Sequence, residues 1–403
     1  MKVVFDGEIL GKNYESSESG IYRVSAELLK NLYKKKDIEL SLTNHCYNRD
    51  EKIQSKILKF LKNFNYNIPL ANQPARRKFL PFRKEKLFKI IYKKIGISDF
   101  HLHYDKSYLK DADIYHSVFF PFDKRLQQFP NLKRVITIHD MIPFLFPNYD
   151  IGKHLDAIIE SITEDDTIVC VSNHTKKDLV RLAPRLKNNA IHVVHLAASK
   201  ELFYPCENQK KIESIKNKYA IKDKYFLSLS TLEPRKNIDF VIRNFIKFIS
   251  DNNINDLQLV LVGGKGWKYE TIFEAYENAE SLKNKIIFTG HVENDELASI
   301  YSHAQSFYYM SFYEGFGLPP LEAMQCGVPV VVSNLSSLPE VVGDAGIMLD
   351  PNDNEALVVT MKDLYYDNKK RRDYSEKSLL QAAKFSWEKT ADEYLEIYKK
   401  IIN

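Results

Sequence analysis

Short runs of β-branched and large apolar residues alternate along the chain with stretches whose apolar residues recur at helical spacing. Continuous apolar runs are typical of strands buried on both faces, and their alternation with helices predicts parallel sheets. The runs predict strands over residues 2–6, 114–117, 134–139, 167–172, 191–196, 225–230, 257–262, 285–289, 306–311, 328–333 and 346–349. We therefore expect an α/β protein.

Capping residues mark the start of two of the intervening helices. Ser172 precedes a helical pattern that includes 175–182, and Asn237 precedes one over 238–249. Both side chains are expected to accept a hydrogen bond from a free backbone N–H of the first turn. Each helix would then follow closely on the preceding strand.

A break in the strand–helix series divides the chain into two parts. Polar residues follow Pro205, and a new series starts at Tyr225. We place the boundary there, which gives domains over 1–204 and 205–385. The final segment, 386–403, carries the pattern of an amphipathic helix.

Composition narrows the class of protein. The 403 residues suffice for two domains of ordinary size, and 44% hydrophobic residues can fill two cores. The 58 basic and 53 acidic residues give a net charge of +5, too mild to indicate nucleic acid binding. The scattered cysteines are expected to be free thiols in a reducing compartment: Cys46, Cys170, Cys206 and Cys326. The chain opens on a strand rather than a signal peptide, and its apolar runs are too short to span a bilayer, so we expect a cytoplasmic protein.

Residues 76–95 stand apart in charge, with nine basic residues and one acidic residue, Glu85. On a helical wheel their apolar side chains gather on one arc and the basic ones on the other. Such a helix either lies in the plane of an anionic membrane face or packs its apolar side on the core. The sequence supports both interpretations equally.

The most specific phrase is 311–322, Ser-Phe-Tyr-Glu-Gly-Phe-Gly-Leu-Pro-Pro-Leu-Glu. It places Glu314 in a glycine-containing loop after a strand and Glu322 one turn into the next helix. Pro319 and Pro320 suit a first helical turn, where the missing N–H costs nothing. The free N–H groups and dipole of that helix favour a phosphate, with hydroxyl groups within reach of the two carboxylates.

A second phrase, 230–237, follows a strand and opens a helix. It sets Arg235 and Lys236 beside a helix start. Two fixed cations can hold a diphosphate and stabilise it as it leaves. The two phrases together therefore predict a site for a diphosphate joined to hydroxylated groups.

These phrases resemble retaining GT-B glycosyltransferases of the glycosyltransferase family 4 type, above all bacterial mannosyl- and rhamnosyltransferases of surface polysaccharide. The resemblance implies two Rossmann-like domains facing a cleft, with the final helix crossing back to the first domain. The first domain would bind the acceptor and the second the nucleotide sugar. Glu314 would accept hydrogen bonds from the donor sugar and Glu322 from the ribose, while Arg235 and Lys236 would neutralise the diphosphate in place of a metal.

Other residues enter the site by the same resemblance. His139 ends a strand in the phrase Thr-Ile-His-Asp and would touch the donor sugar near the reacting carbon, with Asp140 orienting it or contacting the acceptor. Two glycines are expected in the site from the local pattern alone. Gly20, which begins a helix after a polar loop, would let the donor approach the backbone, and Gly264 would form a tight turn near the nucleotide. The backbone of the Glu314 loop would touch sugar or phosphate through Gly315, Phe316, Gly317 and Leu318.

Several weaker patterns argue against other classes. The glycines of 263–266 lack the third glycine of a dinucleotide loop, because Tyr269 stands there, so a nicotinamide dehydrogenase is disfavoured. Residues 111–113, Asp-Ala-Asp, match a metal–diphosphate motif but are more simply a turn. His101 and His103 form a pair without a third ligand. We therefore expect no metal and no cofactor.

The expected reaction is metal-independent transfer of a hexose, with mannose as the best guess, from a GDP- or UDP-linked sugar. The acceptor would be a saccharide or lipid-linked saccharide of O-antigen, capsule or lipopolysaccharide. Two alternatives remain open, a sugar-nucleotide epimerase or hydrolase on the same fold and a non-catalytic partner subunit of a transferase. The protein would be peripheral on the inner face of the plasma membrane if 76–95 binds lipid.

Overall fold

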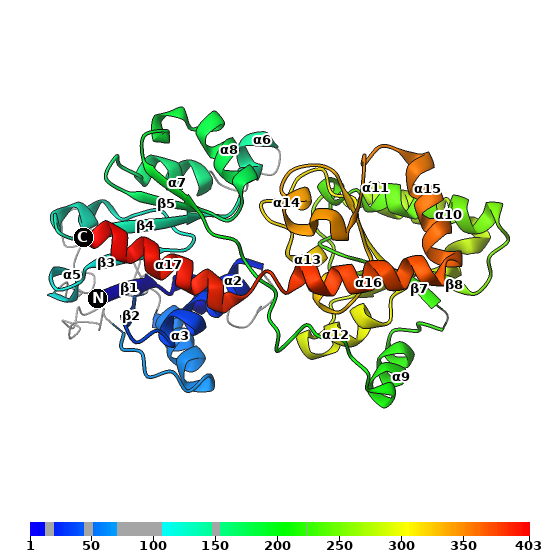
Figure 1. Cartoon of the computed structure of the whole chain (residues 1–403), viewed down its shortest axis with the longest axis horizontal. Coiled ribbons are helices and arrows are strands. Elements are labelled where there is room, and N and C mark those ends of the chain that lie inside the picture. The colour runs from blue at the N-terminus through cyan, green and yellow to red at the C-terminus, as the bar shows by residue number, and fades with distance from the viewer. Residues whose placement is uncertain (13–19, 44–50, 71–106, 147–153, 223) are drawn as a thin grey trace, which may run out of the picture.

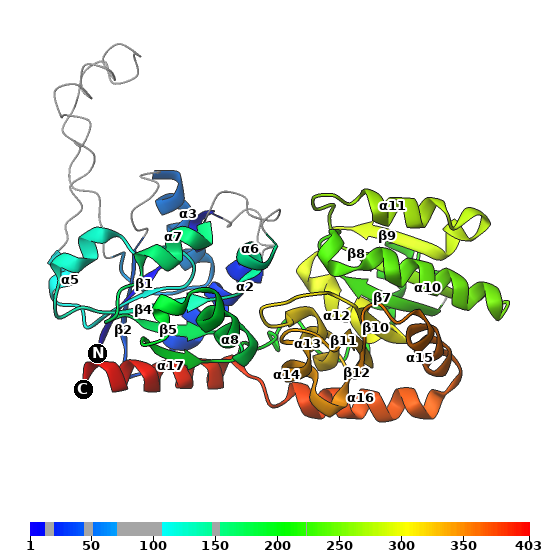
Figure 2. The ribbon, with the colours of Figure 1, turned by 90° about the horizontal axis from the view of Figure 1, so that it is seen from above.

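A computed structural model describes residues 1–12, 20–43, 51–70, 107–146, 154–222 and 224–403. Within these ranges the chain forms two halves, each built on a six-stranded parallel sheet flanked by helices (Figures 1 and 2). The strand–helix alternation in the sequence thus predicted the fold class correctly. Segment 76–95, Cys46 and the pair His101 and His103 lie outside the described residues.

The N-terminal sheet has the strand order β2-β1-β3-β4-β5-β6. Its strands are β1 (Lys2–Asp6), β2 (Glu39–Thr43), β3 (Ile114–Ser117), β4 (Lys133–Ile138), β5 (Thr167–Cys170) and β6 (Ala190–Val193). The sequence analysis missed β2. This strand lies at the sheet edge and pairs only with β1 among the described strands, so its sequence lacks the continuous apolar run of a central strand.

The C-terminal sheet has the order β12-β11-β10-β7-β8-β9. Its strands are β7 (Lys224–Leu229), β8 (Leu257–Val262), β9 (Ile286–Gly290), β10 (Ser306–Tyr309), β11 (Val330–Ser333) and β12 (Ile347–Leu349). All six were predicted, with ends that differ by at most two residues. The central strands β7, β8, β10 and β11 are buried nearly throughout, as their apolar runs require.

Helices cover both sheets. The N-terminal half holds α1 (Glu8–Lys12), α2 (Gly20–Tyr33), α3 (Glu51–Asn63), α5 (Ser107–Lys110), α6 (Ile142–Leu145), α7 (His154–Ser161) and α8 (Asn173–Leu182). The rest of the chain holds α9 (Gln209–Lys218), α10 (Ile238–Asp251), α11 (Glu270–Glu277), α12 (Asn294–Ser302), α13 (Leu318–Gln325), α14 (Leu338–Val342), α15 (Asn354–Tyr366), α16 (Asn368–Ala382) and α17 (Trp387–Ile402). Part of the polar loop expected before Gly20 is therefore helical, because Ile9 and Leu10 of α1 are buried in the core.

One of the two predicted caps is present and the other is wrong. Ser172 Oγ accepts from the Thr175 N–H at 3.0 Å, as a cap does. Asn237 precedes α10 in a left-handed conformation with φ 57°, and its side chain makes no capping bond. Its amide instead donates to the Pro351 carbonyl at 2.8 Å, so a distant backbone group has displaced the local one.

The final helix, α17, crosses from the C-terminal half and lies along the N-terminal half (Figures 1 and 2), as expected. A series of hydrogen bonds between buried polar side chains holds α17 against the N-terminal half. Tyr394 Oη lies 2.8 Å from Thr137 Oγ1, and Tyr398 Oη lies 2.6 Å from His116 Nδ1. His116 and Thr137 are themselves bonded at 2.9 Å. Burial lowers the pKa of His116 to about 3, so the chain joins neutral groups.

We keep the domain boundary at 204/205 as a proposal. Its support is that α9, which follows the boundary, packs against α12 of the C-terminal half. Lys218 of α9 also pairs with Glu296 of α12 at 2.7 Å.

Within the described ranges, no helix combines the length and apolarity that crossing a membrane requires. Three of the four cysteines fall there, and all three are buried free thiols: Cys170, Cys206 and Cys326.

Candidate active site

A cavity of about 570 Å³ opens between the two halves, at the carboxyl ends of both sheets. Open parallel sheets bind ligands at this edge. Every residue that the sequence analysis assigned to the site lines this cavity: Gly20, His139, Arg235, Lys236, Gly264, Glu314, Gly315, Phe316, Gly317, Leu318 and Glu322. The structure therefore gathers residues that are up to 302 positions apart, from Gly20 to Glu322, around one space.

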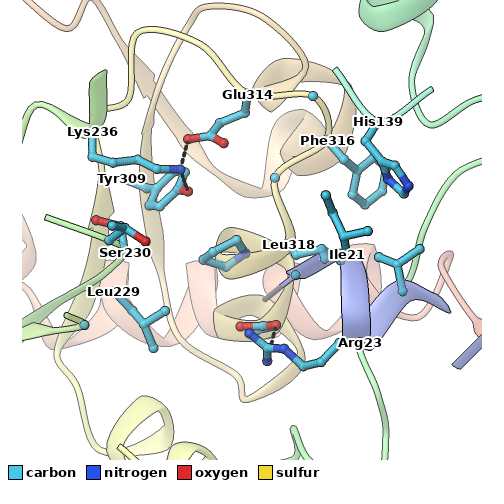
Figure 3. A pocket seen from close by; sticks show the side chains of 18 of the residues that line it. Ile21, Arg23, His139, Leu229, Ser230, Lys236, Tyr309, Glu314, Phe316 and Leu318 are labelled. Atoms are coloured by element: carbon cyan, nitrogen blue, oxygen red, sulfur yellow. Dashed lines mark hydrogen bonds and ion pairs between the residues drawn. The ribbon is translucent and has the colours of Figure 1, made fainter. Parts of the chain in front are cut away.

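A buried ion cluster forms one part of the cavity. Lys236 Nζ lies 2.6 Å from Glu314 Oε1, and Arg235 Nη1 lies 3.1 Å from the same oxygen. Lys236 also donates to Tyr309 Oη at 2.7 Å (Figure 3). Arg235 pairs in addition with Glu233 at 2.5 Å and donates to the Tyr313 carbonyl.

The charges of this cluster support one another. Burial alone would raise the pKa of Glu314, but Lys236 and Arg235 outweigh it and lower that pKa to about 2. Burial lowers the pKa of Lys236, and Glu314 opposes that change. Glu314 is thus a carboxylate at neutral pH, held in place by two cations.

Glycine lets the Glu314 loop (residues 313–317) approach the N-terminal half. A Cβ atom at Gly315 would lie 1.9 Å from the His139 carbonyl oxygen, so no side chain fits there. Gly317 has φ 117° and starts α13, a conformation that favours glycine. Gly315 therefore allows the close contact between the halves, and Gly317 allows the turn into α13.

His139 contributes a neutral ring. Its Nε2 lies 2.8 Å from the Val118 carbonyl, which can only accept, so Nε2 carries the proton. Burial lowers the pKa of His139 to about 4, which leaves Nδ1 as an acceptor. Figure 3 shows His139 beside Phe316, across the cavity from Lys236. The described contacts show Val118 holding the ring, whereas Asp140 instead accepts from the Ile142 N–H at 2.9 Å.

Glu322 lies in a different electrostatic setting. Its Oε1 accepts from Arg23 Nη1 at 3.2 Å, and its Oε2 accepts from Tyr301 Oη at 3.1 Å. Burial raises the pKa of Glu322, and Arg23 lowers it only in part. The structure does not join Glu322 to the cluster around Glu314.

Arg23 and Tyr309 were missed by the sequence analysis. Arg23 lies three residues after Gly20 on α2, a spacing that puts both on one face of the helix, and this could have indicated it. Tyr309 ends β10 two residues before Ser311, the start of the 311–322 phrase, so its position at the carboxyl edge was the available signal. Apolar side chains also line the cavity: Leu229, Val262, Val292 and Leu297.

The weaker patterns lie in different places. Neither Asp111 nor Asp113 lines the cavity, and Asp113 Oδ2 accepts from the Lys2 N–H at 2.7 Å at the amino edge of the N-terminal sheet. Two glycines of 263–266, Gly263 and Gly264, do line the cavity. Gly263 has φ 134° and packs on the Ser230 carbonyl, as a tight turn requires. No group of three or more histidine, cysteine, aspartate or glutamate side chains that could hold a metal occurs in the described part of the chain.

Comparison with known proteins gives the class. Residues 210–400 match the family model described as glycosyl transferases group 1. The chain is 34% identical over 291 residues to the O-antigen chain mannosyltransferase B of Escherichia coli, an alignment that covers 71% of this chain and 74% of that protein. It is 29% identical over 276 residues to the serotype-specific mannosyltransferase WbdA of Escherichia coli, covering 67% of this chain and 34% of that longer protein. The chain therefore belongs to the group 1 glycosyltransferases.

Solved structures show the same fold at low identity. A glycosyltransferase from Rickettsia africae superposes with a TM-score of 0.68 at 18% identity, over 100% of this chain and 98% of the other. HepE of Anabaena, solved in complex with UDP and glucose, gives a TM-score of 0.68 at 15% identity over 99% and 100% of the two chains. These similarities confirm the predicted GT-B fold.

Proposed function

We propose that this protein is a retaining mannosyltransferase of the family 4 type, which moves mannose from GDP-mannose to a saccharide or lipid-linked acceptor in O-antigen synthesis. The names of the sequence relatives support mannose and O-antigen. One structural observation carries the proposal, the buried Arg235–Glu314–Lys236 cluster beside the start of α13 in a cavity between two parallel-sheet halves.

The diphosphate of the donor would lie against the cations of this cluster. An ammonium group has three N–H donors, and Lys236 directs two of them to Glu314 and Tyr309. A third remains for a phosphate oxygen. The start of α13 adds the backbone N–H of Leu318, since Pro319 and Pro320 carry none, and the positive end of the helix dipole. These charges would stabilise the phosphate as the bond to the sugar breaks, without requiring a metal.

The nucleoside would occupy the rest of the cavity. Arg23 opposes the effect of burial on the pKa of Glu322, and the carboxyl oxygens of Glu322 can accept hydrogen bonds from ribose hydroxyls. Leu229, Val262 and Val292 offer apolar surface to the faces of a base. The UDP bound to HepE supports a nucleoside diphosphate in general, and the mannosyltransferase relatives favour guanine.

The donor sugar would lie between Glu314 and His139. Carboxylate oxygens accept more than one hydrogen bond, so Glu314 can hold its cations and a sugar hydroxyl together. The neutral Nδ1 of His139 can accept from another hydroxyl. Because Glu314 is strongly ion-paired, it is a poor nucleophile for a covalent sugar–enzyme intermediate. Retention would then follow front-face transfer: the bond from C1 to the phosphate oxygen breaks, the bond from C1 to the acceptor oxygen forms, and the acceptor proton passes to the departing phosphate.

The direct test is transfer by the purified protein. GDP-mannose, UDP-glucose and UDP-galactose are offered with and without an O-antigen saccharide acceptor, in the presence and absence of EDTA. We expect mannose transfer from GDP-mannose with an α linkage by NMR, unchanged by EDTA. Conversion of the donor without acceptor, at the rate seen with it, would instead indicate an epimerase or hydrolase. Absence of transfer despite nucleotide binding would favour a partner subunit.

Membrane contact through 76–95 stays a separate proposal, because its support is the charge pattern alone. Flotation with anionic liposomes tests it. Changing Lys86, Lys89, Lys93 and Lys94 to Glu should abolish binding, and equal binding of the variant would contradict it.

A further inference from the structure

One face of α8 in the N-terminal half forms hydrogen bonds with the Glu314 loop of the C-terminal half. Ser172, Thr175 and Asp178 recur at intervals of three residues, so they lie along one side of the helix and its cap. Ser172 Oγ and Thr175 Oγ1 both donate to the Gly315 carbonyl, at 2.7 and 3.0 Å. Tyr313 Oη donates to Asp178 Oδ2 at 2.7 Å. All five residues lie away from solvent.

These bonds bracket Glu314. Tyr313 precedes it and Gly315 follows it, and both are held by α8. The side chain of Glu314 points the other way, to Lys236 of its own half (Figure 3). The position of the carboxylate is thus set jointly, with its charge partners in one half and its flanking residues anchored to the other.

The N-terminal end of α8 also contacts α14. Glu340 accepts from the Asn173 N–H at 3.0 Å and lies 2.6 Å from His195 Nε2. A carboxylate at a helix N-terminus is favoured by the free N–H groups and the dipole. The start of α8 is therefore seated in the C-terminal half on two sides, by the Glu314 loop and by Glu340.

Asp178 is well suited to anchor the loop. Burial would raise the pKa of Asp178, but Arg181 and the Tyr313 hydroxyl outweigh it and lower that pKa. A charged acceptor makes the bond from Tyr313 stronger than a neutral one would. Arg181 approaches Asp178 Oδ1 at 2.7 Å and is half exposed, so it can be removed separately.

We propose that Asp178 is a positioning residue for the transfer step, acting through Tyr313 to fix the loop that carries Glu314 while the two halves are together. This inference rests on the proposed function for its kinetic consequence. The nucleotide site lies mainly in the C-terminal half and does not include Asp178 or the Tyr313 hydroxyl. Loss of the bond should therefore slow transfer more than it weakens nucleotide binding.

The test compares Tyr313→Phe and Asp178→Ala, with Arg181→Ala as the matched control. We expect kcat to fall tenfold or more in the first two, with the GDP Kd changed less than twofold. The double variant should be no slower than the slower single variant, because both remove the same bond. Arg181→Ala should keep kcat within twofold.

Hydrogen–deuterium exchange gives a readout that does not need activity. Peptides over 311–318 should exchange faster in Tyr313→Phe and Asp178→Ala than in the unmodified protein, and at the unmodified rate in Arg181→Ala. Unchanged exchange in Tyr313→Phe would overturn the positioning role. A parallel loss of kcat, GDP affinity and melting temperature would also overturn it, as the bond would then be purely structural. If the unmodified protein binds no nucleotide, the proposed function fails, while the exchange experiment still decides whether Asp178 holds the loop.

Discussion

The two glutamates of the 311–322 phrase lie in opposite electrostatic settings. Glu314 touches two cations of its own half, and its pKa falls to about 2 against the pull of burial. Glu322 touches one cation, Arg23, from the other half, and burial raises its pKa. The pKa values of two identical side chains eight positions apart are thus shifted in opposite directions because of the number and origin of their partners.

The two ends of the cleft therefore differ in which half of the protein supplies their charged groups. The Glu314 end is charged with groups of the C-terminal half alone, which suits the electrostatic work of releasing a phosphate. At the Glu322 end the ion pair joins the two halves, which suits recognition of hydroxyl groups when the cleft is assembled. Variants at the first end should therefore change turnover, and variants at the second should change binding.

The largest effect is expected at the cluster. If the proposed function is correct, Lys236→Ala removes a cation that stabilises the departing diphosphate and should lower kcat by about 10²–10³-fold, with a similar loss for Glu314→Ala. Steady-state kinetics measure it, and circular dichroism checks that the fold is intact. The exposed Lys247, changed to Ala, is the control and should behave like the unmodified protein. Near-normal turnover in both cluster variants would refute the assignment of this end.

A smaller effect on binding is expected at Glu322. In the proposed complex Glu322 accepts from the ribose, so Glu322→Gln should weaken GDP binding by about 10–100-fold, with a smaller change in kcat. Isothermal titration calorimetry gives the Kd. Glu274→Gln, on the exposed face of α11, should leave it unchanged. If Glu322→Gln lost kcat but kept its Kd for GDP, the proposed division between turnover at the Glu314 end and binding at the Glu322 end would be wrong.

Arg23 should set how binding depends on pH. Burial already raises the pKa of Glu322, and the guanidinium of Arg23 opposes this, with Tyr301 and Cys326 as the other titratable neighbours. Removing the charge in Arg23→Gln raises that pKa further, so more Glu322 is protonated as the pH falls. GDP binding by this variant should therefore weaken more steeply than binding by the unmodified protein as the pH is lowered, whereas Arg23→Lys should follow the unmodified profile. Parallel profiles for Arg23→Gln and the unmodified protein would show that Arg23 does not govern the charge.

The smallest expected effect concerns stability in acid. The folded-state pKa of Glu314 is about 2, below its ordinary 4.5, so its ion pairs stabilise the fold above pH 4.5 and lose this contribution as the pH falls toward 2. Glu314→Gln should melt a few degrees lower than the unmodified protein at pH 6–7. The gap should narrow below pH 4.5 in thermal melts. A constant gap across this range would mean that the carboxylate charge is not what stabilises the cluster.

The local sequence pattern was enough to predict which residues would lie together at the cavity. His139 and Gly264 each follow a buried strand, and Arg235 and Glu314 lie in loops after others. In parallel sheets these carboxyl ends share one edge, so residues far apart in sequence meet there. The roles of these residues in transfer remain predictions, because geometry alone does not measure them.

Several contacts that the sequence did not predict join residues far apart in the chain. Arg23 meets Glu322 across 299 positions, and Tyr313 meets Asp178 across 135. The Asn237 cap failed because Pro351, 114 positions away, offered its carbonyl to the same side chain. Capping propensities describe hydrogen bonds between residues that are near one another in the sequence. They do not include hydrogen bonds that a distant backbone group offers to the same side chain.

The amino-acid sequence by itself determined the α/β class, the run of strands and the residues that ring the cleft, because apolar periodicity and turn residues act over a few positions at a time. Only the tertiary structure decided which carboxylate is strongly charged, which half supplies its partner and what holds the Glu314 loop. Those outcomes depend on burial and on charges that meet only after the two sheets have packed, and Coulomb energies and desolvation costs are set by distances in space.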